Sequence, residues 1–129
     1  MITPFYAALL ALLAFLFVFL SGRVIKLRLK YQVGIGDGEH PLLARAIRVQ
    51  GNFGEYVPFA LLLVWMYETM NGAPLLVHIL GVALCVGRIL HAYGVSQKNE
   101  TLLFRQCGMV TTFAVMVISA LSILLKYLS

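Results

Sequence analysis

The sequence predicts an all-α membrane protein in which four transmembrane helices form an antiparallel bundle. We expect one domain, covering residues 1–129. Of the 129 residues, 61% are hydrophobic and 12% are charged, whereas soluble domains have roughly 45 to 50% apolar and about 25% charged residues. Long apolar runs alternate with three short polar links. Helices joined by such short links pack as antiparallel neighbours.

The first helix begins in a stretch without charge, from Met1 to Gly22. This stretch is long enough for a spanning helix of about 20 residues. A signal peptide would carry basic residues before its apolar core, but here they follow it. They are Arg23, Lys26, Arg28 and Lys30. Their helical spacing predicts that the helix continues past the hydrocarbon and ends before the glycine-rich turn of residues 33–38.

Prolines and glycines bound the other three helices. Pro41 is suited to the first position of the second helix, which we expect to run to Met70. At 1.5 Å per residue this helix would be about 45 Å long. Its first turns should therefore lie outside a hydrocarbon layer of roughly 30 Å. The third helix is expected over residues 75–95 and the fourth over residues 102–128.

The distribution of lysine and arginine predicts the orientation in the membrane. All of them except Lys126 lie near the first or the third link. The positive-inside rule places those links in the cytoplasm and both termini outside. The net charge of +5 does not favour nucleic-acid binding, because the basic residues are neither interleaved with aromatics nor carried on a polar domain.

A polar stripe interrupts the second helix. Arg45, Arg48, Asn52 and Glu55 lie at positions i, i+3, i+7 and i+10, which share one narrow helical face. An apolar run follows Glu55, so its carboxylate should lie at hydrocarbon depth and needs a partner. Gly51 and Gly54, on the adjoining face, would let another helix approach closely. The alternative is a set of interfacial charges whose arginines extend toward lipid phosphates, and for Arg45 this alternative stays open.

Other polar residues are predicted at the same end of the bundle. Arg88 and His91 share a face of the third helix, and Arg105 begins the fourth. Arginines bind carboxylates through forked hydrogen bonds, and Glu55 would bind an amine. The cluster therefore suits a small zwitterionic ligand that is rich in carboxylates. No metal site is predicted, because the histidines and cysteines lack ligand spacing, and Cys85 and Cys107 are interpreted as small core residues.

Three motifs resemble those of a known family. The pattern Arg48-x-x-x-Asn52-x-x-Glu55-Tyr56-x-Pro58 is similar to the helix-two signature of the MAPEG superfamily, the membrane-associated proteins in eicosanoid and glutathione metabolism. Residues 87–94 and residues 104–108 resemble its helix-three motif and its helix-four entry. The match covers the whole chain in length, layout and motif order.

The resemblance implies a homotrimer that binds glutathione as a co-substrate between neighbouring subunits, near the cytoplasmic side. Arg105 matches the catalytic arginine that stabilises the thiolate. A guanidinium beside a thiol with a pKa of about 8.5 favours the anion, which is the nucleophile. The residues implied to bind glutathione are Lys26, Arg28, Arg48, Asn52, Glu55, Tyr56, Arg88 and His91. Several relatives have a tyrosine where this chain has Val95, and Tyr93 lies about 160° away around the helix.

The function predicted is that of a glutathione-dependent transferase or peroxidase of the inner membrane. It would join the activated thiolate to a small hydrophobic electrophile that arrives through the membrane lipid. An alternative is a non-catalytic scaffold of the same fold that binds lipid or thiol, although Arg105 argues against it. A small multidrug transporter would need an acidic residue within the first helix, and that helix has none. Metal ions and nucleic acid are not expected.

Overall fold

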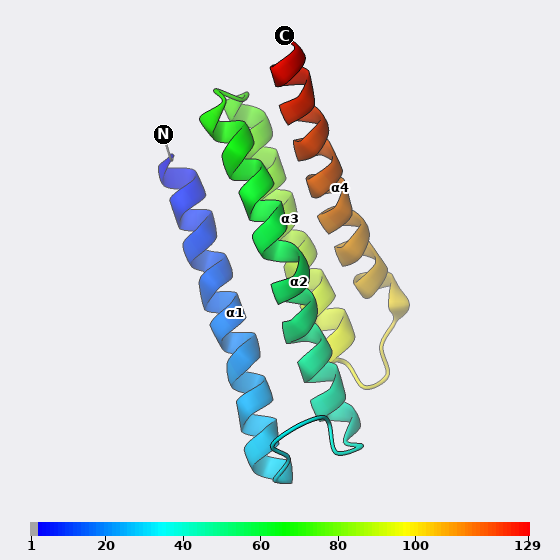
Figure 1. The fold of residues 1–129 in the computed structure, drawn as a ribbon. Coiled ribbons are helices and arrows are strands. Elements are labelled where there is room, and N and C mark those ends of the chain that lie inside the picture. Colours follow the sequence, from blue (N-terminus) through cyan, green and yellow to red (C-terminus); the bar gives the residue numbers. More distant parts are fainter. Residues whose placement is uncertain (1–2) are drawn as a thin grey trace.

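The computed structural model describes residues 3–129, and within them it contains four helices and no strand (Figure 1). The helices are α1 (Pro4–Tyr31), α2 (Pro41–Thr69), α3 (Pro74–Ser96) and α4 (Leu102–Leu128). These bounds agree with the sequence prediction to within one residue at nearly every end. The prediction of four helices is confirmed.

Local sequence accounts for where the helices begin and end. Pro4, Pro41 and Pro74 occupy the first positions of α1, α2 and α3, where a missing N–H costs nothing. The hydroxyl of Thr3 accepts a hydrogen bond of 3.2 Å from the backbone N–H of Tyr6 and so caps α1. Gln32 ends α1 in the left-handed conformation, with φ of 56°. These short-range signals explain why the bounds could be predicted.

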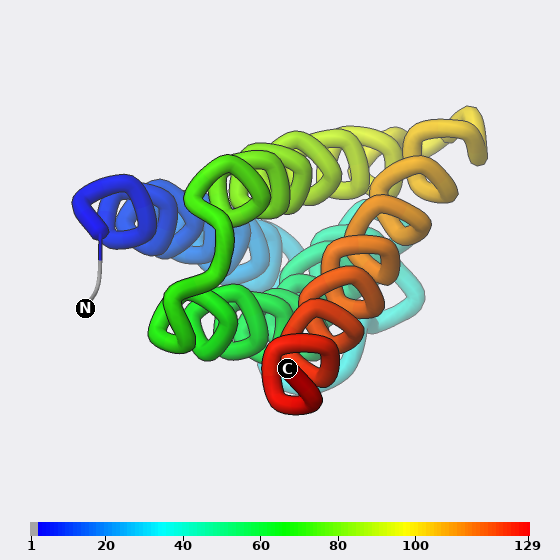
Figure 2. Tube along the Cα trace, turned by 90° about the horizontal axis from the view of Figure 1, so that it is seen from above, coloured from blue at the N-terminus to red at the C-terminus, as the bar shows by residue number. Residues whose placement is uncertain are grey.

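Seen along the helices, the bundle has α1 and α4 at opposite corners, and each of them contacts both α2 and α3 (Figure 2). α2 and α3 pack against each other in the middle, with α1 on one side and α4 on the other (Figure 2). Within the described residues, α1 makes no contact with α4. The beginning of α1 and the end of α4 lie at one end of the molecule, and the α1–α2 and α3–α4 links lie at the other (Figure 1). The two links predicted to be cytoplasmic are therefore neighbours in space.

Three helices in the described part of the chain are long and apolar enough to cross a membrane, namely α1, α3 and α4. Length and composition thus confirm three of the four expected membrane-spanning helices. α2 has 29 residues and matches its neighbours in length, but Arg48, Asn52 and Glu55 lower its apolarity. The polar stripe that predicts a binding site on α2 is therefore also the reason that α2 is less apolar than the other three helices.

Close approach of α3 and α4 depends on glycine. A Cβ atom on Gly108 would lie 2.6 Å from the carbonyl oxygen of Gly87 and 2.6 Å from the Cβ atom of His91. By contrast, a Cβ atom on Gly51 or Gly54 of α2 would have no atom closer than 3.4 Å. Within the protomer, the closest helix approach involves Gly87 and Gly108, whereas the nearest atom of another helix to a Cβ atom on Gly54 is 3.8 Å away.

The two cysteines differ in environment. Cys85 is partly buried, but Cys107 is exposed on α4. The interpretation of both as core residues is therefore wrong for Cys107, because α4 has no helix on that face within the protomer.

Replacing Gly108 with alanine is expected to destabilise the protein by about 1 to 3 kcal/mol, because the added methyl group overpacks the contact with α3. Thermal unfolding of the detergent-solubilised protein measures this loss. Gly22→Ala is the matched control, since a Cβ atom there has nothing within 4 Å. Equal melting temperatures for the two variants would show that the α3–α4 contact is looser than described.

Candidate functional site

A groove lined by basic residues lies at the end of the molecule that carries the α1–α2 and α3–α4 links. It consists of two adjoining pockets with volumes of about 310 and 190 Å³. Arg48, Val95 and Arg105 line both pockets. The other lining residues are Pro41, Ala44, Arg45, Asn52, His91, Glu100 and Met109. We call this the basic groove; its walls come from the first half of α2, the end of α3 and the start of α4.

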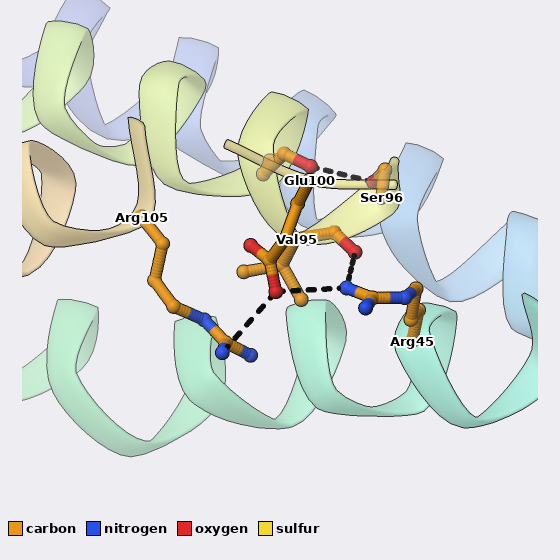
Figure 3. Close-up of polar contacts among 6 residues, drawn as sticks. Arg45, Val95, Ser96, Glu100 and Arg105 are labelled. Atoms are coloured by element: carbon orange, nitrogen blue, oxygen red, sulfur yellow. Dashed lines mark hydrogen bonds and ion pairs between the residues drawn. The ribbon is translucent and has the colours of Figure 1, made fainter. Parts of the chain in front are cut away.

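A carboxylate joins two of the arginines in the basic groove. One oxygen of Glu100 lies 2.9 Å from Nη1 of Arg45 and 3.2 Å from Nη1 of Arg105 (Figure 3). The Arg45 guanidinium also donates to the backbone carbonyl of Val95, at 3.1 Å. Glu100 therefore connects α2 to α4 across the end of α3.

Arg48 and Glu55 form a third ion pair of the site. Their side chains approach to 3.3 Å across two turns of α2. Both side chains are about half exposed on the protomer, at 56% and 51%. Glu55, which was predicted to need a partner, thus has one on its own helix, but both side chains remain half exposed on the surface of the protomer.

Arg88 lies behind the groove and is 1% exposed. Its guanidinium donates to Oδ1 of Asn52 at 2.6 Å and to the hydroxyl of Thr112 at 3.4 Å. A longer contact of 3.5 Å reaches Nδ1 of His91. No carboxylate among the described residues forms an ion pair with Arg88. Because guanidinium can only donate, Asn52 must accept with its oxygen, which leaves its amide N–H groups to donate elsewhere.

The charges of the site favour an anionic ligand. The four arginines at positions 45, 48, 88 and 105 face two carboxylates, Glu55 and Glu100. Two positive charges are therefore uncompensated, and a cleft of one sign attracts ligands of the other. The described residues contain no cluster of histidine, cysteine and carboxylate side chains that could hold a metal ion.

The structure brings most of the predicted site residues together. Arg48, Asn52, His91 and Arg105 line the basic groove, and Arg88 supports Asn52 from behind. Glu55 joins the groove through Arg48.

Three of the predicted residues lie elsewhere in the protomer. Lys26 is exposed on α1, and Arg28 donates to the carbonyls of Gly36 at 2.8 Å and Val33 at 3.4 Å in the α1–α2 link. Tyr56 packs edge-on against Phe113 of α4. None of the three lines the groove of its own protomer.

Val95 and Tyr93 lie on different faces of α3, as the helical spacing predicts. Val95 is buried in the groove wall. Tyr93 is exposed and packs edge-on against Phe104. Tyr93 therefore does not replace the tyrosine that several relatives have at the position of Val95.

Sequence reasoning missed Glu100 as a site residue and left the role of Arg45 open. A signal was present, because Glu100 is the sole acidic residue between residue 69 and the end of the chain, and it lies among basic residues. Its proximity to Arg45 depends on how the α3–α4 link folds over α2. Periodicity along one helix does not contain that information.

Comparison with known proteins supports the resemblance noted from the motifs. The model of the MAPEG family matches residues 6–125. Inner membrane protein YecN from Escherichia coli (strain K12) is 39% identical over 123 residues, which cover 95% of this chain and 89% of the relative. The protein of the same name from Escherichia coli O6:H1 (strain CFT073) gives the same identity and coverage.

Proposed function

The chain belongs to the MAPEG family of membrane proteins, and on that premise we propose that it binds glutathione in the basic groove and transfers the thiolate sulfur to an apolar electrophile. The observation that carries the proposal is the composition of the groove. Arg48, Asn52, His91 and Arg105 converge from three helices on one pocket, with Glu55 beside Arg48. Glutathione has two carboxylates, one ammonium and one thiol, and each of these groups has a suitable partner there.

The proposed chemistry is a nucleophilic substitution or addition at carbon. The thiol of glutathione loses its proton to water, and the nearby guanidinium of Arg105 stabilises the thiolate. The thiolate then donates an electron pair to the electrophilic carbon and forms a C–S bond. The electrons of the bond that breaks leave with the departing group, or, for an activated alkene, form a carbanion that takes a proton from water. With a hydroperoxide as acceptor, two glutathione molecules would give the disulfide, an alcohol and water.

A homotrimer is part of the proposal. The Arg48–Glu55 pair is half exposed on the protomer, yet Glu55 lies on a helix flanked by apolar spans, where an uncovered carboxylate is costly. Lys26 and Arg28 do not reach the groove of their own protomer, so a neighbouring subunit would supply them. Native mass spectrometry in mild detergent should then show trimers, and monomers alone would argue against a shared site.

The proposed location is the inner membrane, with α2 as a fourth span, the groove on the cytoplasmic side and both termini outside. The relative that shares 39% identity is named an inner membrane protein, and the basic residues gather at the link end. A reporter enzyme that works only outside the cytoplasm should be active when it is fused after Ser129. A reporter that works only in the cytoplasm should be active when it is inserted in the turn of residues 34–38. The reverse pattern would put the groove on the wrong side for cytoplasmic glutathione.

A second candidate function is non-catalytic binding of thiol or lipid. The observation that favours it is the ion pair of Arg105 with Glu100 at 3.2 Å, because a guanidinium already paired with a carboxylate stabilises a thiolate less. This candidate predicts ligand binding without formation of a bound thiolate. The transferase predicts both.

The test of the proposed function is a thermal-stability assay of the detergent-solubilised protein with a panel of thiols. A ligand that binds only the folded state stabilises it by RT ln(1 + [L]/Kd), about 2.7 kcal/mol at a concentration of 100 times Kd. Glutathione should raise the melting temperature more than cysteine, which lacks the second carboxylate. No increase with any thiol would remove the basis of the proposal.

A further inference from the structure

Glu100 is the most deeply buried carboxylate of the basic groove, with 7% of its side chain exposed. It lies in the link between α3 and α4, and its Oε1 atom is shared between Arg45 of α2 and Arg105 of α4 (Figure 3). Its second carboxylate oxygen is buried and has no hydrogen-bond partner. Burying a carboxylate is costly unless it is paired, so a residue in this position needs a structural or functional reason.

The two arginines depend on Glu100 to different degrees. Arg45 is also held by the carbonyl of Val95 at 3.1 Å. Within residues 3–129, the contact with Glu100 is the sole polar contact of the Arg105 guanidinium, although 41% of its side chain is exposed. A long side chain with one anchor loses its fixed orientation when that anchor is removed. Arg105 is therefore oriented by Glu100 alone, whereas Arg45 is oriented by both Glu100 and the carbonyl of Val95.

We propose that Glu100 is a positioning residue that holds the guanidinium of Arg105 in the wall of the basic groove, where it can act on a bound thiol. The effect on a bound thiol rests on the proposed function. The orientation of Arg105 by Glu100 rests only on the contacts of Glu100. Glu100 touches neither ligand nor reacting atoms; it acts through Arg105. The link of residues 97–101 thereby becomes part of the site.

Two effects of Glu100 on the ligand thiol have opposite signs. As a negative charge, Glu100 opposes a thiolate, so removing it would lower the pKa of the bound thiol. As the anchor of Arg105, it brings a positive charge to the thiol, so removing it would raise that pKa. The other charged or titratable groups that face this region are Arg45 and Arg48 of α2 and His91 of α3. Of these, Arg45 also loses its pair with Glu100 but keeps its hydrogen bond to Val95. The sign of the shift therefore separates the two roles.

The test uses Glu100→Gln, which keeps the shape of the side chain, and Glu100→Asp, which keeps the charge but is one methylene shorter. We expect the thiolate titration of bound glutathione to move to higher pH by about half a unit in Glu100→Gln, with turnover at neutral pH reduced about threefold. Glu100→Asp should move in the same direction, because its carboxylate does not reach both guanidinium groups. Glu39→Gln, in the exposed α1–α2 link, removes the same charge and should change neither quantity. A shift to lower pH in Glu100→Gln, or no shift, would overturn the proposal.

A second measurement does not depend on thiol binding. Arginine side chains react with phenylglyoxal, and peptide mapping by mass spectrometry gives the rate at each position. Arg105 should react severalfold faster in Glu100→Gln than in the unmodified protein, while Arg45, still held by Val95, should change less. Equal rates at Arg105 would overturn the positioning role, whatever the protein binds. If the unmodified protein binds no thiol, the proposed function fails, but the rates at Arg105 still decide the role of Glu100.

Discussion

Replacing Glu55 with glutamine is expected to weaken glutathione binding by about 30-fold or more. Truncating one partner of a desolvated charge pair costs roughly 2 to 5 kcal/mol, and 1.4 kcal/mol corresponds to a factor of ten in affinity. Glu55 is half exposed on the protomer and is paired with Arg48 at 3.3 Å. The full effect is therefore expected only in the proposed trimer, where a neighbouring subunit and the ligand would exclude water from this face. Isothermal titration calorimetry measures the change.

Two controls make the Glu55 result specific. Glu68→Gln removes the same charge from the same helix, about 20 Å away at 1.5 Å per residue, and should leave binding unchanged. A glutathione analogue without the amino group should bind the unmodified protein weakly and should lose little more affinity to Glu55→Gln, because both changes remove the same contact. If the losses from the analogue and the variant add, Glu55 acts by holding Arg48 and does not bind the ammonium.

Replacing Arg105 with alanine is expected to move the titration of the bound thiol to higher pH while leaving much of the binding intact. A positive charge within about 4 to 6 Å of an acidic group lowers its pKa by 1 to 3 units. Because Glu100 compensates part of the charge of Arg105 at 3.2 Å, we expect a shift of about one unit. The ultraviolet absorbance of the thiolate follows the titration directly, and steady-state kinetics should show a lower kcat at neutral pH.

The control for Arg105 is Arg23→Ala. Arg23 is at the same end of the molecule, but it donates to Ser96 at 2.7 Å and lines neither pocket of the basic groove, so its loss should not affect the thiol. If Arg105→Ala changes neither the titration nor turnover, Arg105 is only the partner of Glu100, and the catalytic assignment is wrong.

The helices could be predicted because their signals are local. Apolar runs set their length, and residues such as Pro41 and Pro74 set where they begin. The stripe of Arg48, Asn52 and Glu55 was predictable for the same reason, since residues on one helix keep fixed angular positions. The structure confirms that these side chains lie beside the groove or line it.

The contacts between elements could not be predicted in the same way. Glu100 meets Arg45 only because the α3–α4 link folds back over α2, and nothing in the periodicity of either helix indicates this. The separation of α1 from α4 is likewise a property of the packing, because α2 and α3 contact each other between them. Composition predicted a bundle, but it did not predict that Arg48 and Glu55 would be half exposed on the protomer.

The central claim is that the basic groove binds glutathione and stabilises its thiolate. The most direct test is the ultraviolet difference spectrum of the unmodified protein mixed with glutathione at neutral pH, with S-methylglutathione as the reference ligand. The account predicts thiolate absorbance in a saturable amount, at a pH where free glutathione is mostly protonated, and none with S-methylglutathione. Binding of both ligands without thiolate absorbance, or no binding of either, would contradict it.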